Sequence, residues 1–288
     1  MAPKRFEREL LGAETFTPAP LHRFLADLER TTSSGDVWKR LVALGQEVDL
    51  PSIDFIAASC YADWRRTLFI RTSYDSSFLH TASSDPEISK WSYFRSHAIE
   101  RLTPILIGIE FAEDYHPQPE GRLKLLRLAA EQGLRAGFSV PLRIHVPPQA
   151  AMITFSGDHS RERMLEILSE HGWTLNVAAM AAHQRYMFHF ATEFFDRNEI
   201  TPKQRALLEL VGQGLQDKQI AERLGISISA LRQRMNGLMS KAQLANRAEI
   251  AALAMSVGLL PDPELWQENL SVLVEMDDAG VRVRSHKK

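Results

Sequence analysis

The side chains best suited to binding chemistry lie between residues 217 and 244, where basic and polar residues recur at helical spacing. A short helix over 218–224 and a longer helix that begins at Ser227 or Ser229 flank Gly225, a residue type that tolerates the unusual backbone of a tight turn. Two helices that cross at such a turn allow the second helix to enter the major groove of DNA. The spacing therefore predicts a helix-turn-helix.

The longer helix of this motif has an apolar face and a polar face. The apolar residues expected to be buried are Ile226, Leu231, Met235 and Leu238. The opposite face carries side-chain types that reach base edges and phosphates. The candidate DNA-binding residues are Lys218, Ser227, Ser229, Arg232, Gln233, Arg234, Asn236 and Lys241. Because surface arginines and glutamines are often only solvated, the pattern alone leaves simple packing of helices open as an alternative.

The charge of this region favours a nucleic-acid surface. Residues 201–260 hold 8 Lys and Arg against 4 Asp and Glu, whereas the whole chain has a net charge of −2. Neutralisation of phosphates requires such a local excess of positive charge. We therefore expect double-stranded operator DNA as a partner of the last third of the chain.

The bulk composition is that of an ordinary globular protein with one large domain or two smaller ones, at 288 residues, 44% hydrophobic and 24% charged. The single cysteine, Cys60, excludes an internal disulfide and a Cys-rich zinc site. We expect no membrane span, because no stretch approaches about 18 consecutive apolar residues. The charged N-terminus without an apolar core predicts no secretory signal. We therefore expect a cytoplasmic protein.

The sequence offers no motif of an enzyme. The histidines show no metal-ligand spacing, and no nucleophile elbow of the GxSxG type is present. Gly212 and Gly214 follow a helix pattern and lack the Lys-Ser/Thr of a phosphate loop. We expect no catalytic residues, no metal and no cofactor.

Hydrophobic periodicity predicts the elements that position these residues. In the last third, helices are expected at 203–211, 218–224, 229–243 and 248–257. In the first 190 residues, helices are expected at about 20–32, 35–46, 88–101, 119–135 and 160–188, and strands at about 53–61, 67–73, 138–144 and 150–156. Strands mixed with helices, without regular βαβ alternation, predict an α+β domain of the α-β-α sandwich type. The expected order is this domain (18–190), a linker (191–198), an all-α four-helix helix-turn-helix domain (199–262) and a C-terminal extension (263–288).

The stretch of about 60 residues from Thr201 resembles the DNA-binding domain of the LuxR family. The resemblance rests on Thr201-Pro202, Gly214-Leu215 and the segments 218–227 and 246–259. It implies a DNA-binding transcriptional regulator that acts as a homodimer on paired half-sites, with RNA polymerase as a further partner.

Four positions depart from the usual pattern of the family. Gln204 stands where the family usually has Glu, a change expected to loosen a packing or capping contact. Ala230-Leu231 replaces Thr-Val at the start of the recognition helix, and Arg234 replaces a common His. The changes in the recognition helix bear on which operator is read.

The first 190 residues lack the acidic pair and the acceptor Asp of a phosphorylated receiver domain. They resemble, more weakly, the autoinducer-binding domain of the LuxR family. The resemblance rests on AAEQGLRAGFSVPL (129–142), AAMITFSGD (150–158) and PEISKWSYFRSHAIERLTPIL. Gly137 matches a characteristic glycine of the family, which we interpret as a requirement of the backbone.

The resemblance implies a small-molecule site in this domain. Trp91 fits the family's Trp that donates to a lactone carbonyl, whereas Thr103 stands at the family's Asp that accepts the ligand's amide N–H. Thr103 can accept a hydrogen bond but brings no charge. The candidate ligand residues are Trp91, Thr103, Tyr61, Phe111 and Thr154. Each of these residues could instead be ordinary core or helix-end structure.

Two interpretations of the input domain stay open. It binds an acyl-homoserine lactone through altered contacts, or it has lost lactone binding and acts without ligand or through another small molecule or protein partner. The C-terminal extension is equally open, because it reads as a disordered tail or as a docking helix. The apolar residues of that docking helix would be Leu265, Trp266, Leu270, Val272 and Leu273.

Overall fold

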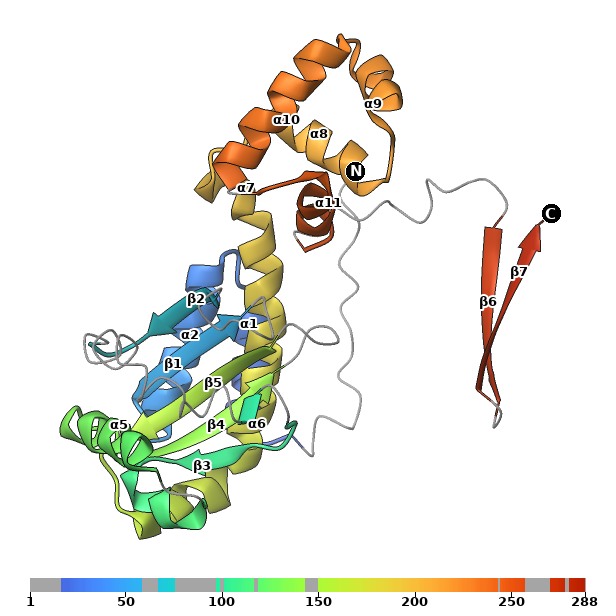
Figure 1. Ribbon diagram of the computed structural model, residues 1–288. Coiled ribbons are helices and arrows are strands. Elements are labelled where there is room, and N and C mark those ends of the chain that lie inside the picture. The colour runs from blue at the N-terminus through green and yellow to red at the C-terminus, as the bar shows by residue number, and fades with distance from the viewer. Residues whose placement is uncertain are drawn as a thin grey trace. The chain divides into compact units, whose positions relative to one another are not determined.

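The computed structural model divides into two compact units, Met1–His189 (unit 1) and Phe190–Lys288 (unit 2) (Figure 1). It describes residues 17–58, 67–75, 97–98, 101–116, 119–142, 150–242, 244–256, 270–277 and 280–287. Each unit is built on its own core, so the two are described separately. None of the described helices is long and apolar enough to cross a bilayer.

Unit 1 is organised around a five-stranded sheet of order β2-β1-β5-β4-β3, in which all neighbours are antiparallel. The strands are β1 (Ser52–Ala58), β2 (Thr67–Thr72), β3 (Ile105–Ile107), β4 (Ala136–Leu142) and β5 (Ala150–Gly157). Successive side chains of a strand point to opposite faces. In β1 the faces differ in character, because Ile53 and Phe55 alternate with Asp54.

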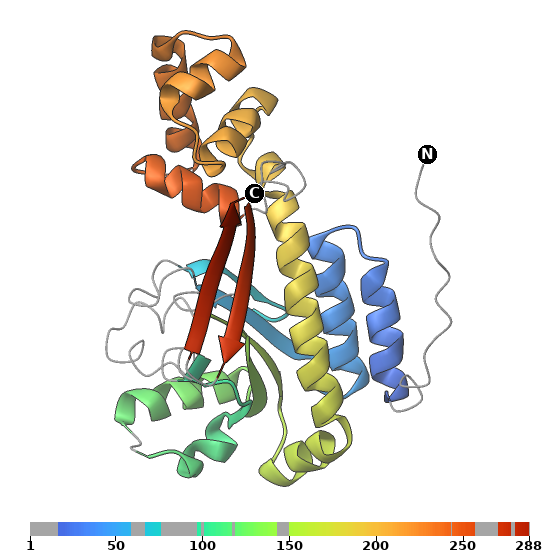
Figure 2. The ribbon, with the colours of Figure 1, turned by 90° about the vertical axis from the view of Figure 1, so that its right-hand side faces the viewer.

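Helices cover both faces of this sheet. The helices α1 (Ala19–Glu29), α2 (Ser34–Glu47) and α6 (Arg161–Thr192) lie side by side on one face (Figures 1 and 2). Phe55 contacts the rings of His183 and Tyr186 of α6 edge-on. On the other face, Leu126 of α5 (Glu120–Glu131) clusters with Ile105 of β3. The predicted α-β-α sandwich is therefore confirmed.

Some predicted bounds of unit 1 were wrong. Strand β3 and the short 3-10 helix η4 (Ile109–Asp114) were not predicted, because three apolar residues after a proline give no periodic signal. The segment expected as a linker, 191–198, is mostly helical, since α6 continues to Thr192 and α7 (Phe194–Arg197) follows. Burial of Phe195 in the core of unit 2 explains this helical turn. The expected helix 88–101 lies largely outside the described residues.

Unit 2 contains four further helices around one apolar core, as predicted. They are α8 (Pro202–Gly212), α9 (Asp217–Leu224), α10 (Ile228–Ala242) and α11 (Arg247–Ser256). The Thr201 hydroxyl accepts from the Gln204 backbone, and the Gln204 side chain accepts from the Thr201 N–H, which forms a capping box. Gln204 therefore keeps the capping contact that its replacement of Glu was expected to loosen.

The C-terminal extension forms a hairpin of β6 (Leu270–Asp277) and β7 (Gly280–Lys287). The predicted docking helix was therefore wrong for Leu270, Val272 and Leu273, which lie in β6. Leu265 and Trp266 lie outside the described residues. The physical reason is the sequence GVRVRS in β7, whose apolar and polar residues alternate with period two and favour a strand. The expected four-helix unit thus gains a β element.

Candidate functional site

The turn between α9 and α10 positions the candidate DNA-binding helix. Gly225 ends α9 in the left-handed region, at φ 61°, and its N–H bonds back to Ala221 and Glu222. An added Cβ would meet no atom within 4 Å, so Gly is required here for its backbone conformation. The Ser227 hydroxyl accepts from the Ala230 N–H at 3.1 Å and caps α10. Ser227 is therefore the cap, and Ser229 lies inside the helix.

One face of α10 is buried in the core of unit 2. Leu231 and Leu238 are fully buried, and Met235 is nearly so, against Ile220 and Ala221 of α9. Ile226 is partly buried against the same cluster. This packing confirms the predicted apolar face and fixes which side of α10 faces away from the core.

The opposite face of α10 is exposed and polar. It carries Ser229, Arg232, Gln233 and Asn236, which the sequence predicted for that face. Within the described part of the chain, the side chains of Arg232, Gln233 and Asn236 make no hydrogen bond or ion pair. Their donors and acceptors are thus available, and these residue types pair with base edges or phosphates in the major groove.

The remaining predicted DNA-binding residues occupy other places. Arg234 is half-buried on the flank of α10, and Lys218 is exposed on α9. The Lys241 ammonium donates to the Glu199 carbonyl at 2.7 Å, which ties α10 to the segment before α8. Ser227 is a cap whose hydroxyl is engaged by the backbone. The structure thus gathers four of the predicted residues on one exposed face and distributes the others around it.

A positioning residue that the sequence did not single out is Arg247. Its guanidinium pairs with the Asp217 carboxylate at 2.6 Å and also donates to the Leu215 carbonyl. These bonds hold the start of α11 against the start of α9. The cap of α9 is Gln216, with Gln219 in a capping box. The carboxylate of Asp217, the first residue of α9, pairs with Arg247.

The face of the unit 1 sheet opposite α1, α2 and α6 carries a polar row, Thr72–Asp54–Thr154–Ser139, across β2, β1, β5 and β4. These residues lie directly opposite one another in the register, so their side chains share one face. The Ser139 and Thr154 hydroxyls lie 3.0 Å apart, and the Tyr74 hydroxyl donates to the Asp54 carboxylate at 3.4 Å. Thr154 also hydrogen-bonds Asp54.

Asp54 carries the carboxyl group of this row, and the pKa of that group is shifted. Desolvation by burial raises the pKa of Asp54 to about 7, against the opposing effect of its hydrogen bonds from Thr154 and Tyr74. Burial raises the pKa of Tyr74, and the nearby charge of Asp54 raises it further. Ser139 and Thr154 are fully buried. Asp54 was not predicted from the sequence, although a single carboxylate inside the apolar strand SIDFIAA was a usable signal.

Gly137 lies on the same face, one step along the sheet from the polar row. It stands opposite Ser156, and an added Cβ would approach the Ser156 Oγ to 2.7 Å and the Ile107 Cγ1 to 3.0 Å. Gly137 is therefore required for space on this face, and the predicted requirement of the backbone was wrong.

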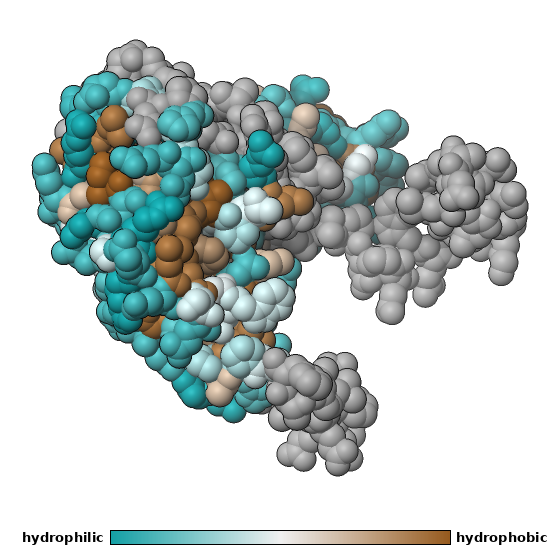
Figure 3. Space-filling model, turned by 90° about the horizontal axis from the view of Figure 1, so that it is seen from below, coloured by the Kyte–Doolittle hydropathy of each residue, from teal (hydrophilic) through white to brown (hydrophobic). Residues whose placement is uncertain are grey.

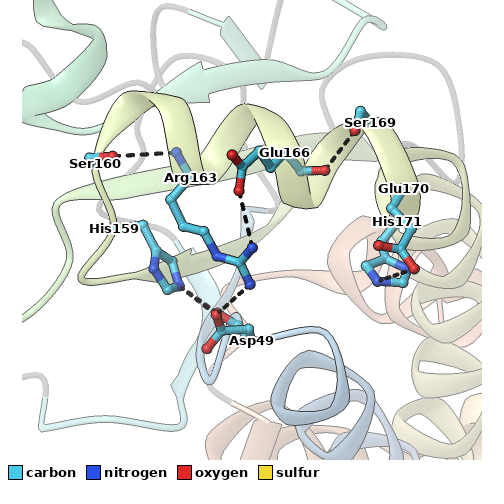
Figure 4. Close-up of polar contacts among 8 residues, drawn as sticks. All are labelled: Asp49, His159, Ser160, Arg163, Glu166, Ser169, Glu170 and His171. Carbon is cyan, nitrogen blue, oxygen red and sulfur yellow. Dashed lines mark hydrogen bonds and ion pairs between the residues drawn. The ribbon is translucent and has the colours of Figure 1, made fainter.

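A cluster of charged residues at the start of α6 has a structural role (Figure 4). The His159 Nε2 is 2.6 Å from the Asp49 carbonyl, and Arg163 bridges Asp49 at 3.1 Å and Glu166 at 3.2 Å. The pairs tie the α2–β1 turn, where Asp49 has φ 63°, to α6. Among the described residues, no group of three or more His, Cys, Asp or Glu side chains could hold a metal.

Comparisons with known families match both units. Residues 94–186 match the model of the autoinducer binding domain, and residues 198–254 match that of the bacterial regulatory proteins of the luxR family. The chain is a LuxR-type transcription regulator. Its two functional regions are therefore an input domain of the autoinducer-binding type and a helix-turn-helix domain.

Individual relatives of this LuxR-type regulator are distant. It is 39% identical over 61 residues to the nitrate/nitrite response regulator protein NarL of Escherichia coli strain K12, a match that covers 21% of this chain and only 28% of NarL. Its fold is similar to the crystal structure of E. coli SdiA, with 13% identity, a TM-score of 0.47 and coverage of 84% of this chain and 98% of SdiA. CepR2 from Burkholderia cenocepacia, described as an N-acylhomoserine lactone dependent LuxR family transcription factor, gives 16% identity, a TM-score of 0.44 and coverage of 60% and 96%.

The predicted ligand residues of this LuxR-type regulator do not form one cluster. Thr154 lies in the polar row. Thr103 is exposed, and its carbonyl is 2.6 Å from the His97 Nε2. Phe111 is fully buried in η4, with the Arg161 guanidinium 4.7 Å from its ring centroid. Trp91 and Tyr61 lie outside the described residues, so their ligand roles stay predictions.

Proposed function

We propose that this chain is a homodimeric transcription regulator that binds operator DNA through α10 and senses a small molecule on the polar face of its sheet. The observation that carries the proposal is the exposed face of α10 with Arg232, Gln233 and Asn236. These side chains bring donors and one positive charge to a helix whose other face is fixed in the core. Because a regulator of this kind acts where the DNA lies, the proposed location of this chain is the cytoplasm.

The proposed signal is an acyl-homoserine lactone or a related amphiphile. Support comes from the pairing of polar and apolar residues on one face of the unit 1 sheet. The polar row offers hydroxyls and a carboxyl, and the neighbouring row brings Ile56 opposite Met152, in a cluster with Ala98. A ligand with a polar headgroup and an acyl chain matches both parts. The competing hypothesis, a regulator without lactone binding, rests on the exposed and uncharged Thr103.

The proposed homodimer follows from the single reading helix of each chain, since two half-sites require two copies. The helix α6 offers an apolar surface for this contact, because Leu165, Trp173, Met180 and Phe188 are exposed within one arc of the helix. Seen from below, apolar patches lie among hydrophilic residues on the surface of the molecule (Figure 3). RNA polymerase is the further partner that a regulator bound at a promoter would contact.

The proposal is tested by expressing the full chain with a panel of N-acyl-homoserine lactones of short and long acyl chain. Ligand extracted from the purified protein is measured by mass spectrometry, and DNA affinity is measured by gel shift with and without that ligand. One lactone retained at stoichiometric level, with a change in DNA affinity, is the expected result. Full DNA binding without any retained lactone would favour the competing hypothesis.

A further inference from the structure

We infer that the hairpin β6–β7 joins two copies of this chain, because strand β6 pairs with β6 of a second copy to form one four-stranded antiparallel sheet. The inference rests on the proposed homodimer, since a second copy must be present, and deepens it by naming a contact outside α6. The two strands of the hairpin pair along their whole length, from Leu270 opposite Lys287 to Asp277 opposite Gly280.

The hairpin has two outer edges that could take a further strand. It is a two-stranded sheet, and within the described ranges of the chain neither edge pairs with another strand. An isolated hairpin is only marginally stable in water, whereas three or more strands with an apolar face are stable. The N–H and C=O groups of an unpaired edge also bind another strand readily. A further strand would therefore stabilise the hairpin.

The register gives the hairpin one largely apolar face. Residues directly opposite one another share a face, and successive residues alternate between faces. The positions on this face are Leu270, Val272, Val274 and Met276 of β6 with Val281, Val283, Ser285 and Lys287 of β7. The other face includes Glu275 opposite Arg282. A strand that is added must keep these faces together, because a shift by one residue would set polar residues among the apolar ones.

Strand β7 is unsuited to pairing with a copy of itself. It carries Arg282 and Arg284 two residues apart, and no acidic residue lies within 280–287. An antiparallel self-pairing centred on residue 283 sets Arg282 opposite Arg284 of the second copy, and one centred on residue 284 sets Arg284 opposite itself. Like charges directly opposite one another destabilise a strand pair, and charged edges keep sheets from associating.

Strand β6 admits pairing with a copy of itself. An antiparallel pairing centred on Leu273 sets Val272 opposite Val274 of the second copy, which joins the apolar faces of the two hairpins. Glu275 then falls opposite Ser271, so no like charges face each other. Pairings centred one residue to either side share both properties.

Symmetry excludes the mixed alternative, in which β6 pairs with β7 of another copy. Such a contact uses different edges of the two copies, so it leaves one edge free at each end and can repeat into an open chain. Pairing of β6 with β6 uses the same edge of both copies and closes after two. The resulting order β7-β6-β6-β7 places the basic strands at the outer edges.

The first test locates the pairing by disulfide cross-links in the full chain, after Cys60→Ser has removed the native thiol. A residue at the symmetry axis lies opposite its own copy, with a Cα separation of about 4.5–5.5 Å that a disulfide can span. The β6 variants Val272→Cys, Leu273→Cys and Val274→Cys are compared with Val281→Cys and Val283→Cys of β7. Covalent dimer formed on mild oxidation is measured by gel electrophoresis without reductant and by intact mass.

The second test measures dimer dissociation by sedimentation equilibrium for the wild type, Val274→Lys and the matched control Val283→Lys. Residues 274 and 283 lie opposite each other, so a lysine affects the hairpin itself similarly at either position, whereas only residue 274 lies on the strand that pairs. Circular dichroism verifies that both variants are folded.

We expect one β6 cysteine to cross-link well above both β7 cysteines. Val274→Lys should raise the dissociation constant of the dimer at least about tenfold, and Val283→Lys should change it less than about threefold. A wild-type dimer without preferential cross-links from β6, or equal dissociation of the two lysine variants, would overturn the inference and leave the proposed homodimer standing. A wild type that stays monomeric at every concentration would overturn both.

Discussion

Replacement of Asp54 by Asn should stabilise unit 1 at alkaline pH and slightly destabilise it in acid. The pKa of Asp54 is raised from 3.8 to about 7 in the folded chain, so the folded state holds its proton at pH values where the unfolded state has lost it. The free energy of unfolding therefore falls as pH rises from about 4 through about 7. An Asn side chain has nearly the same shape but cannot ionise, so Asp54→Asn does not show this fall in the free energy of unfolding.

The magnitude follows from the size of the shift. Each pKa unit corresponds to about 1.4 kcal/mol, so the rise from 3.8 to about 7 corresponds to at most about 4 kcal/mol between the two pH limits. Hydrogen bonds that Asn makes less well than Asp, from Tyr74 and Thr154, would subtract about 1 kcal/mol at every pH. We expect Asp54→Asn to be the more stable protein above neutral pH.

The assay is urea unfolding of the full chain at a series of pH values, followed by tryptophan fluorescence. Four of the five tryptophans, at positions 38, 64, 91 and 173, precede the boundary at residue 190, so the signal reports mainly on unit 1. The difference between variant and wild type cancels the other titrating groups. A difference that does not change with pH, or a variant that is less stable than the wild type at about pH 8, would refute a buried carboxyl at Asp54.

Three further predictions concern single residues of either unit. Burial lowers the pKa of His183 to about 4, so the unfolded chain takes up a proton before the folded chain does. The free energy of unfolding of the wild type should therefore fall by up to about 3 kcal/mol as pH falls from about 6.5 to about 4. In urea titrations His183→Gln should remove this dependence on pH, and an unchanged dependence would contradict the prediction. Gly225→Ala should cost only about 1–2 kcal/mol in the thermal unfolding of unit 2, because its left-handed backbone is strained without any clash; a much larger loss would point to contacts that the structure does not have. Gly137→Ala should destabilise unit 1 by about 1–3 kcal/mol, and a second change, Ser156→Ala, should recover part of that loss, whereas additive effects would contradict the close approach of these residues.

The helical part of the fold could be predicted because its signals are local. The helix-turn-helix depends on apolar spacing, on Gly225 and on a cap at Ser227, all within a few residues of one another. The signal for the hairpin β6–β7 is equally local, but the apolar residues of the extension were interpreted with helical period. The helical course of 191–198 was missed because its cause, burial of Phe195, lies in tertiary contacts.

The candidate ligand site could be predicted only in part, because its chemistry comes from residues that are distant in sequence. Thr154 was found through the resemblance of its strand to a family. Asp54 on its own reads as a solvent-facing residue of an alternating strand. Its meaning depends on partners 20 and 100 positions away, Tyr74 and Thr154, which only the register of the sheet brings together. The part of the site at Trp91 and Tyr61 lies outside the described residues.

The central claim, that the exposed face of α10 reads DNA, is tested most directly by the salt dependence of operator binding. The full chain is used to select a binding site from a random DNA library, and gel shifts over a range of salt concentrations compare the wild type with Arg232→Ala and Lys203→Ala. Both variants lose one exposed positive charge, from α10 and α8 respectively. The account predicts a steep slope for the wild type, a weaker affinity and a slope smaller by about 1 for Arg232→Ala, and no change for Lys203→Ala. A flat slope for the wild type, or equal behaviour of Arg232→Ala and the wild type, would contradict it.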